Sequence, residues 1–260
     1  MAPAIRRLAR LTIISLGISY CTYLTELIYF QDSYVSEFDA RATEVRGMDV
    51  VLDRTAFYPE GGGQPSDTGT LAGGSRIFTV TKVRKSGPAV LHTVSEPGIT
   101  PGEGMHGEID WERRYEHMRY HTAQHLLSAH FLDRYGARTT GNRISADRGT
   151  IDFDIPRLSP EMVRGTEDRM NRWIELNIPV TIRMMDRSRA LAELDQDRTR
   201  VDRLPKTVKE LRIVSIEGID EVACAGTHVR ETGELVGFRV DRTRSKGKKR
   251  KRLEFVLDRS

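Results

Sequence analysis

A change from short strand-like segments to one long helical pattern constrains the fold of this chain more than any other feature. Residues Trp111–Tyr135 place apolar and histidine side chains three and four residues apart, as on one face of an α-helix, and Gly136 follows as a candidate C-cap. From Glu26 to about Gly107 the chain instead alternates short β-like runs with glycine-rich turns. Examples of these runs are Asp49–Leu52, Arg76–Val83 and Ala89–Val94. We therefore predict an α+β fold in which a small β-barrel or sandwich comes first.

The sequence after the long helix predicts a mixed second domain. Ser159 is a natural N-cap and Pro160 fits the first helical position, so a helix is expected from Ser159 to about Asn177. A short helix is expected over Ser188–Gln196. Expected strands are Gly149–Asp154, Pro179–Met185, Leu211–Ile216, Glu234–Val240 and Leu253–Leu257. The predicted domains are residues 25–108, a β-barrel, and residues 109–260, an α+β domain.

Residues 1–24 do not read as part of either domain. Three arginines precede the weakly apolar run Leu11–Leu24, which superficially resembles a signal peptide. That run is too short to span a membrane, and no clear small-residue cleavage site follows it. We interpret residues 1–24 as an N-terminal extension or a start-site artefact. With two widely separated cysteines, Cys21 and Cys224, the chain is expected to be cytoplasmic rather than disulfide-bonded.

Two histidine-containing pairs of the same spacing suggest a metal site. His121 and His125 are four residues apart on the long helix, so both imidazoles project from one face. Cys224 and His228 repeat the spacing far downstream, and this nitrogen and sulfur donor set suits Zn²⁺. A single such pair would be read as coincidence. No glutamate follows His121, so the HExxH pattern of metalloproteases is not met, and ligand type alone leaves open whether the metal is structural or catalytic.

A glycine-rich segment, Phe57–Gly69, is a second candidate site. Its glycines lack Cβ atoms and let backbone N–H groups approach a ligand closely, so Gly62, Gly63 and Gln64 are candidate substrate-binding residues. Glu60 and Asp67 add polar groups on either side. The alternative is an ordinary tight β-turn. No Lys-Ser or Lys-Thr follows the glycines, which excludes a P-loop.

Short polar side chains form a third candidate site just after the long helix. Thr139, Thr140 and Asn142 lie in Arg138–Ile144, which we expect to be a loop. They are either substrate-binding residues or ordinary turn formers.

One basic run carries most of the chain's positive charge. Arg242–Arg252 contains eight basic residues and no acidic one, which exceeds the net charge of +4, so the rest of the chain is net acidic. It could be a solvated hairpin tip or a nuclear-type signal, but its place between two expected strands favours contact with a phosphate backbone. The candidate nucleic-acid-binding residues are Arg244, Lys246, Lys248, Lys249 and Arg250.

In combination, these motifs resemble the AlaX family of free-standing alanyl-tRNA editing proteins, which are related to the editing domain of alanyl-tRNA synthetase. The resemblance rests on Phe57–Gly69, the His121–His125 pair, the Thr-Gly-Asn residues of Arg138–Ile144, and the Cys224–His228 pair. It extends from about Thr25 to the C-terminus and is closest to the medium-length type. It implies a translation-factor-like barrel followed by an editing domain shared with threonyl-tRNA synthetase.

The resemblance also implies an activity. One Zn²⁺ per chain would be held by His121, His125, Cys224 and His228, and the reaction would be hydrolysis of serine, or glycine, from tRNA(Ala). An alanine-activating site cannot strongly reject the smaller glycine or the near-isosteric serine, so a second site is needed. Thr139, Thr140 and Gln64 are the candidates for binding the serine hydroxyl. Zinc would either activate water or position the substrate.

Two other functions fit the same residues. A zinc-stabilised RNA-binding module without catalysis would use the barrel and the basic run. A zinc hydrolase acting on a small ester or amide would be insensitive to tRNA and to loss of the basic run. Neither reading requires a membrane or a protein partner.

Overall fold

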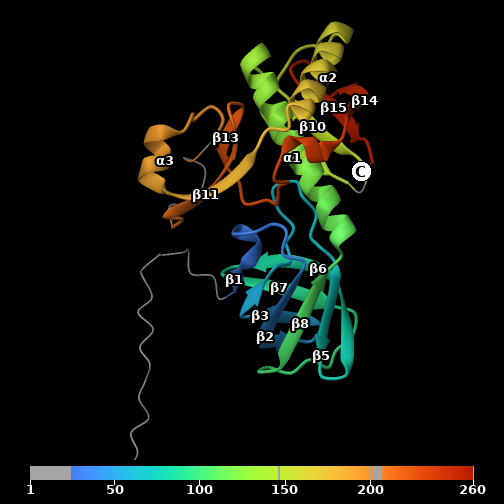
Figure 1. The fold of residues 1–260 in the computed structure, drawn as a ribbon, viewed down its shortest axis with the longest axis vertical. Coiled ribbons are helices and arrows are strands. Elements are labelled where there is room, and N and C mark those ends of the chain that lie inside the picture. Colours follow the sequence, from blue (N-terminus) through green and yellow to red (C-terminus); the bar gives the residue numbers. More distant parts are fainter. Residues whose placement is uncertain (1–24, 146, 200, 202–206, 260) are drawn as a thin grey trace, which may run out of the picture.

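The computed structural model describes residues 25–145, 147–199, 201 and 207–259. Residues 1–24, which we interpret as an extension or a start-site artefact, lie outside the described residues. A β-barrel and a mixed α+β part follow each other along the chain, and helix α1 runs from the barrel into the second part (Figure 1). This arrangement confirms the predicted α+β fold with an N-terminal barrel. Within the described residues, no helix has the length and apolar character needed to cross a membrane.

The barrel closes through antiparallel strands in the order β2–β3–β7–β6–β5–β8. A short parallel pair, β1 (Glu26–Leu27) with β4 (Arg54–Thr55), and the 3₁₀ turn η1 (Ile28–Phe30) accompany it. The barrel strands are β2 (Glu37–Arg46), β3 (Asp49–Leu52), β5 (Gly69–Gly73), β6 (Arg76–Ser86), β7 (Ala89–Val94) and β8 (Gly104–Ile109). Closure pairs every strand on both sides, so no long edge is left exposed.

The interior of the barrel is filled by alternating apolar side chains. On β6 the buried residues are Phe78, Val80 and Val83, so the alternation shifts by one position after Val80. The pairing of β6 with β7 shifts between Val80 and Lys82, which marks a β-bulge at this point. The bulge bends the strand while keeping its apolar residues inside the barrel.

His92 is a buried polar residue within this apolar interior. On β7 it is fully inaccessible, and its two ring nitrogens lie 3.1 Å from the Val50 carbonyl oxygen and 2.8 Å from Thr55 Oγ1. A neutral imidazole satisfies both contacts, since Nδ1–H donates to Val50 and Nε2 accepts from the Thr55 hydroxyl. Burial lowers the pKa of His92 to about 4.

We expect His92 to make the folded state sensitive to acid. Below about pH 6.5 the unfolded chain protonates this histidine, whereas the folded chain resists protonation until about pH 4, so acidification across this window lowers the free energy of unfolding. The gap corresponds to roughly 3 kcal/mol at about 1.4 kcal/mol per pKa unit. Urea unfolding at several pH values should give a shallower dependence for His92→Gln than for the wild type. Parallel pH profiles for the two proteins would contradict this role.

Helix α1 (Trp111–Tyr135) has the predicted bounds. The Asp110 side chain caps its start by accepting from Arg113 N–H, and Gly136 ends it in the left-handed conformation with φ 62°. Most of the helix is buried, because it lies against the barrel at one end and against a sheet and helix α2 at the other (Figure 1). Most buried polar side chains have partners within a protein, but His117 Nδ1 and His130 Nε2 on this helix have none among the described residues.

The second part packs helices against an antiparallel sheet in the order β14–β15–β10–β9. A smaller antiparallel sheet, β11–β12–β13, projects to one side with α3 (Figure 1). The sheet strands are β9 (Thr139–Ile144), β10 (Gly149–Phe153), β14 (Phe238–Ser245) and β15 (Lys251–Leu257). The other elements are α2 (Pro160–Glu175), β11 (Val180–Asp186), α3 (Arg187–Glu193), β12 (Glu210–Ile216), β13 (Asp220–Ala223) and η3 (Thr232–Leu235).

Two expectations about local structure are wrong. Arg138–Ile144 is not a loop, because Thr139–Ile144 forms the edge strand β9 against β10, with a bulge beside Thr140. The expected strand Glu234–Val240 begins only at Phe238, since Thr232–Leu235 forms a 3₁₀ turn. There the side chains of Glu231 and Glu234 make a reciprocal capping box, which favours the turn over a strand.

Candidate metal centre

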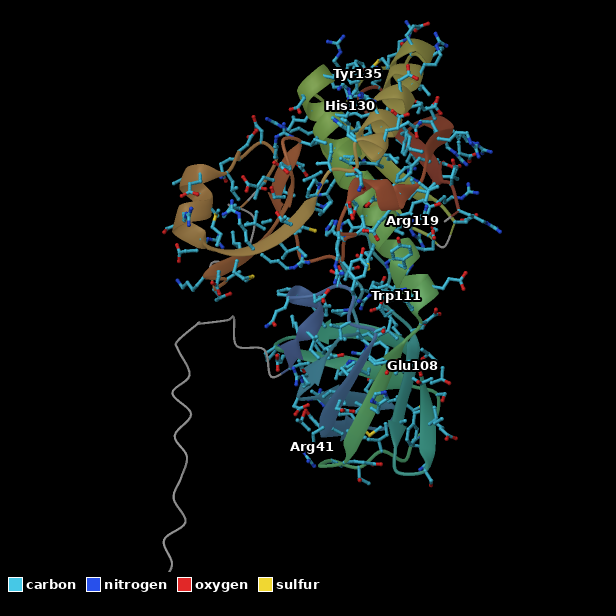
Figure 2. The ribbon with its side chains drawn as sticks, in the orientation of Figure 1. Arg41, Glu108, Trp111, Arg119, His130 and Tyr135 are labelled. Atoms are coloured by element: carbon cyan, nitrogen blue, oxygen red, sulfur yellow. The ribbon has the colours of Figure 1, made fainter. Side chains whose placement is uncertain are left out.

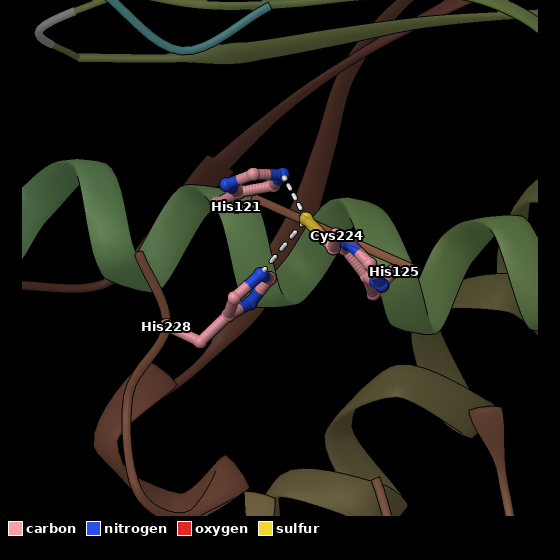
Figure 3. Close-up of side chains that lie close together, drawn as sticks. All are labelled: His121, His125, Cys224 and His228. Carbon is pink, nitrogen blue, oxygen red and sulfur yellow. Dashed lines mark hydrogen bonds between the residues drawn. The ribbon is translucent and has the colours of Figure 1, made fainter. Parts of the chain in front are cut away.

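The structure brings together the four residues of the two spaced pairs. His121 and His125 lie on adjacent turns of α1, and Cys224 and His228 lie on the segment that follows β13 (Figure 3). One ligand atom from each residue lies within 4.8 Å of the others. Cys224 Sγ is 3.6 Å from His121 Nε2 and 3.4 Å from His228 Nε2. Three imidazoles and one thiol thus converge on a common point.

The outer nitrogens of His121 and His125 are held by acceptors. His121 Nδ1 lies 2.9 Å from Gln64 Oε1, which also accepts from Thr227 N–H, so the imidazole must donate to it. His125 Nδ1 lies 3.1 Å from a carboxylate oxygen of Asp220, which can only accept. In both rings Nδ1 therefore carries the proton, and Nε2 presents a lone pair to the cluster.

The third histidine is oriented in the same way. His228 Nδ1 lies 3.1 Å from Thr122 Oγ1, and the Thr122 hydroxyl donates to the Met118 carbonyl oxygen at 3.0 Å. Since that hydroxyl hydrogen is already used, Thr122 accepts from His228. Metal-binding histidines typically have such an outer partner, which fixes both the tautomer and the ring orientation. The donor set and its outer partners fit a metal ion.

The electrostatics of the cluster favour a bound cation. Burial by itself would raise the pKa of the Cys224 thiol, but the imidazoles of His121, His125 and His228 lower it well below its ordinary value. A thiolate is the form of cysteine that binds a metal. Arg212 is buried behind this segment, where its Nη1 donates to the carbonyl oxygens of Cys224 and Gly226.

The glycine-rich segment contributes to the cluster through a turn. Gly61 and Gln64 exchange backbone hydrogen bonds at 3.1 and 2.9 Å, and Gly62 and Gly63 between them have φ values of 58° and 85°. Two consecutive positive φ values are typical of a type I′ turn, which favours glycine at both positions. The turn delivers Gln64 to His121, where its amide nitrogen donates to Thr227 Oγ1 at 2.8 Å.

Glycines also allow two close approaches at the site. A Cβ atom on Gly226 would stand 1.9 Å from His121 Cε1, so only glycine lets this segment pass the imidazole. A Cβ atom on Gly63 would stand 2.3 Å from Asn142 Oδ1, and the Gly63 carbonyl oxygen accepts from Ile144 N–H. The glycine-rich turn therefore lies against β9.

The remaining predicted site residues lie on β9, alongside α1. Thr139 Oγ1 is 2.8 Å from Ser128 Oγ, and Asn142 Nδ2 donates to Gln124 Oε1 at 3.2 Å. Ser128 is three residues from His125 and Gln124 is three residues from His121, so both contacts are one helical turn from the cluster. The Thr140 hydroxyl instead donates to the Asp152 carbonyl oxygen.

The basic residues form the β14–β15 hairpin and do not contribute to the cluster. Arg244 pairs with Glu254 at 2.7 Å, whereas Lys246, Lys248, Lys249 and Arg250 are exposed at the tip without an ion pair to any described residue. Asp152 lies nearby and pairs with Arg252.

Sequence reasoning missed Thr122, Asp220, Thr227 and Arg212. Asp220 lies 95 positions from the histidine it contacts, so no local spacing relates the two. Thr122 follows His121 directly in the sequence, and a polar residue next to a candidate ligand is the one local sign of its role.

We expect Asp220→Asn to weaken metal binding by about 10- to 100-fold, since an amide is a poorer acceptor for the His125 Nδ1–H than a carboxylate. Competition with a chromophoric chelator measures the affinity. Asp195→Asn is a matched control, because Asp195 and Asp220 both lie 3.5 Å from Arg198 but only Asp220 contacts a histidine of the cluster. Equal affinities for the two variants would contradict the orienting role of Asp220.

Comparison with known proteins gives matches along almost the whole chain. Residues 15–113 match the family of class II (A) tRNA synthetases, and residues 211–254 match the second additional domain of threonyl and alanyl tRNA synthetases. The alanyl-tRNA editing protein AlaX-M of Methanosarcina acetivorans is 38% identical over 90% of this chain and 99% of its own length.

Other relatives differ mainly in how much of their own length is covered. AlaX-M of Saccharolobus solfataricus is 35% identical over 90% of this chain and 99% of that protein. The alanine–tRNA ligase of Thermococcus kodakarensis is 36% identical over 84% of this chain, but the match covers only 24% of the ligase. The similarity to the ligase is therefore confined to one portion of that larger protein.

Proposed function

Because the chain belongs to the AlaX-M family of alanyl-tRNA editing proteins, we propose that it hydrolyses the ester between a wrongly attached amino acid and tRNA(Ala), acting in trans. The observation that carries this proposal is the cluster of three histidines and one cysteine, with each histidine fixed by its own partner. An RNA-binding module without catalysis would not need polar groups beside its metal site. Here the polar residues of β9 and the glycine-rich turn lie beside the cluster.

Zinc is the metal we propose for the site. Nitrogen and sulfur donors suit Zn²⁺ better than Mg²⁺ or Ca²⁺. Zinc–ligand bond lengths imply a separation of about 3.6 Å between nitrogen and sulfur in a tetrahedral site. The N···S separations of 3.6 and 3.4 Å in the cluster support this assignment. When bound, zinc supplies Lewis-acid chemistry at this position.

The protein residues around the cluster provide orientation. Gln64, Thr122 and Asp220 hold the Nδ1 protons of the three histidines, which keeps their Nε2 atoms directed at one point. Arg212 fixes the carbonyl groups of the Cys224 segment. A metal ion held in a fixed position by these ligands would in turn hold an ester in a defined orientation, and such positioning lowers the barrier to reaction.

We propose serine as the amino acid that is removed, with glycine as a weaker substrate. An alanine-activating site discriminates poorly against both, whereas a polar editing site can recognise the serine hydroxyl by hydrogen bonding. Thr139 remains a candidate for this contact, because it is an exposed residue whose hydroxyl pairs with Ser128, one helical turn from His125. Gln64 and Thr140 have their side chains engaged elsewhere, by His121 and Thr227 and by Asp152 respectively.

The experiment that tests the proposal compares amino acid and tRNA separately. Release of amino acid is measured from Ser-tRNA(Ala), Gly-tRNA(Ala), Ala-tRNA(Ala) and Ser-tRNA(Ser). We expect rapid release of serine from tRNA(Ala), with alanine spared by about 100-fold or more, as expected where a site's buried polar groups would be left unpaired. Equal rates on Ala-tRNA(Ala), or indifference to the tRNA, would overturn the proposal.

We further propose that the β14–β15 hairpin binds the tRNA backbone. Replacing Lys246, Lys248, Lys249 and Arg250 by glutamine should raise KM and reduce the salt dependence of binding by about one unit of slope per lost phosphate contact, with kcat retained. Binding at several salt concentrations measures this slope. A matched control replaces four exposed arginines elsewhere by glutamine, namely Arg46, Arg54, Arg183 and Arg189. Equal slopes for the two quadruple variants would contradict the assignment.

A further inference from the structure

A cavity of about 780 Å³ lies between the C-terminal half of α1 and helix α2, away from the metal cluster. Its residues on α1 include His130 and Tyr135, which Figure 2 shows near the end of the helix that is farthest from the barrel. His130 follows His125 by five residues, which places it about 140° around the helix axis. The cavity therefore opens on a different face of α1 from the histidines of the cluster, and the proposed hydrolysis does not use it.

Aromatic rings form much of the cavity wall. The His130 ring lies edge-to-face with Tyr135, at a centroid distance of 5.6 Å, and with Trp173 of α2, at 6.1 Å. Tyr135 and Trp173 are each only half-buried, so part of each ring is accessible. Accessible aromatic faces are the surfaces on which proteins stack unpaired nucleobases.

The charged side chains of the cavity wall that lack an ion-pair partner among the described residues are both arginines. Arg134 and Arg169 are exposed on its wall, and neither makes an ion pair with any residue that the structure describes. The Arg169 guanidinium lies over the Trp173 ring, with 5.6 Å between its Cζ atom and the ring centroid.

The two acidic residues of the wall are already neutralised by neighbours. Asp133 pairs with Arg198, and Glu161 pairs with Arg164. The cavity thus offers two free guanidinium groups to an anion, and guanidinium groups suit phosphate oxygens.

Two further features are unexplained by packing. Gly165 occupies the interior of α2, where glycine costs about 1 kcal/mol relative to alanine, yet no atom lies within 4 Å of the position that its Cβ would take. His130 is 7% exposed, and its Nε2 has no hydrogen-bond partner among the described residues. The missing side chain keeps the wall of the cavity open.

We propose that this cavity binds one nucleotide unit, with its base stacked on Trp173 and Tyr135 and its phosphate held by Arg134 and Arg169. The volume lies within the range of about 300–1,000 Å³ that is typical of small-ligand sites. In tRNA the unit would be an unpaired nucleotide other than the aminoacylated one, a role that rests on the proposed function; a free nucleoside monophosphate is the other source.

The fluorescence of Trp173 reports binding directly. The chain has two tryptophans, so Trp111→Phe leaves Trp173 as the single emitter. This protein is titrated with AMP, with CMP, with a single-stranded tetranucleotide of sequence ACCA, and with inorganic phosphate. We expect saturable quenching by nucleotides but not by phosphate alone. Tighter binding of the tetranucleotide than of AMP identifies RNA as the source, and the reverse order identifies a free nucleotide.

Two substitutions of Gly165 distinguish the effect of filling the cavity from the effect of stabilising helix α2. Gly165→Leu fills the cavity and Gly165→Ala does not, although both favour the helix. We expect Gly165→Leu to abolish quenching and Gly165→Ala to retain it, with Arg169→Gln weakening it about tenfold. Quenching that shows this pattern supports the site even if no tRNA is hydrolysed, so the two proposals fail separately. Absence of quenching by every nucleotide, or equal quenching in Gly165→Leu, overturns it.

Discussion

Replacing Cys224 by serine should lower the deacylation of Ser-tRNA(Ala) by at least about 100-fold and reduce the bound metal well below one ion per chain. The reason is that Cys224 contributes the anionic donor of the cluster, since the surrounding imidazoles keep its pKa well below the ordinary value. Loss of an outer partner alone typically costs 10- to 100-fold in metal affinity or activity, so loss of a ligand should cost at least as much.

The measurement is metal content by mass spectrometry beside single-turnover deacylation. Cys21→Ser is the matched control, because it removes the other cysteine of the sequence and should leave both quantities unchanged. The Cys224→Ser protein should still unfold cooperatively, because the α+β part keeps an apolar core that includes Phe131, Phe153 and Phe255. If Cys224→Ser instead unfolds the protein, the metal is structural and the reading as an RNA-binding module gains support.

Replacing Asp67 by asparagine should lower the free energy of unfolding by about 3–5 kcal/mol, the range observed when one partner of a buried ion pair is removed. Asp67 and Arg114 form an ion pair whose side chains are both completely buried. Arg114 also donates to the carbonyl oxygens of Ser33 and Ala56, so the guanidinium joins the start of α1 to the barrel. An amide at position 67 leaves this charge buried without compensation.

Urea unfolding measures the loss. Glu60→Gln is the matched control, since Glu60 lies in the same Phe57–Gly69 segment but is exposed and makes a surface ion pair with Lys82 at 3.3 Å. Surface pairs of this kind contribute up to about 1 kcal/mol. The segment also carries Gln64, so Asp67→Asn should reduce metal affinity even at temperatures where the protein stays folded. Similar unfolding midpoints for the two variants would show that the Asp67–Arg114 pair does not hold the barrel to α1.

The sequence predicts those features that depend on local periodicity. The bounds of α1 follow from its three- and four-residue spacing and from Gly136, and the same periodicity places His121 and His125 on one face. In the barrel, β3, β6 and β7 lie close to the runs expected between glycine-rich turns. That the four residues bind a metal stays a prediction, although the structure places them around one point.

Features that depend on distant contacts are missed. The strand β9 contains Gly141 and Asn142, which are common in turns, and its pairing with β10 makes this segment a strand. Glu234 falls within an expected strand, whereas its side chain caps the turn together with Glu231 and also accepts from the hydroxyl groups of Tyr34 and Tyr115, which lie far away in the sequence. Asp220 was overlooked for the same reason.

Burial changes the interpretation of Gln64. In the sequence, Gln64 follows three glycines and suggests a ligand-binding loop. In the structure it is 1% exposed and contacts His121 and Thr227, so its amide supports the metal cluster from the barrel side. The glycines form a tight turn that positions Gln64 beside His121, whereas substrate binding by Gly62, Gly63 and Gln64 stays a prediction.

We expect a metal ion held by His121, His125, Cys224 and His228 to be required for the removal of serine from tRNA(Ala). The most direct measurement is the rate of serine release from Ser-tRNA(Ala) by wild-type protein as purified, after chelation, and after addition of one equivalent of Zn²⁺, with Ala-tRNA(Ala) measured in parallel. We expect serine release to be lost with the metal and restored by zinc, and alanine release to be negligible throughout. Unchanged release of serine by protein shown to be metal-free would contradict it.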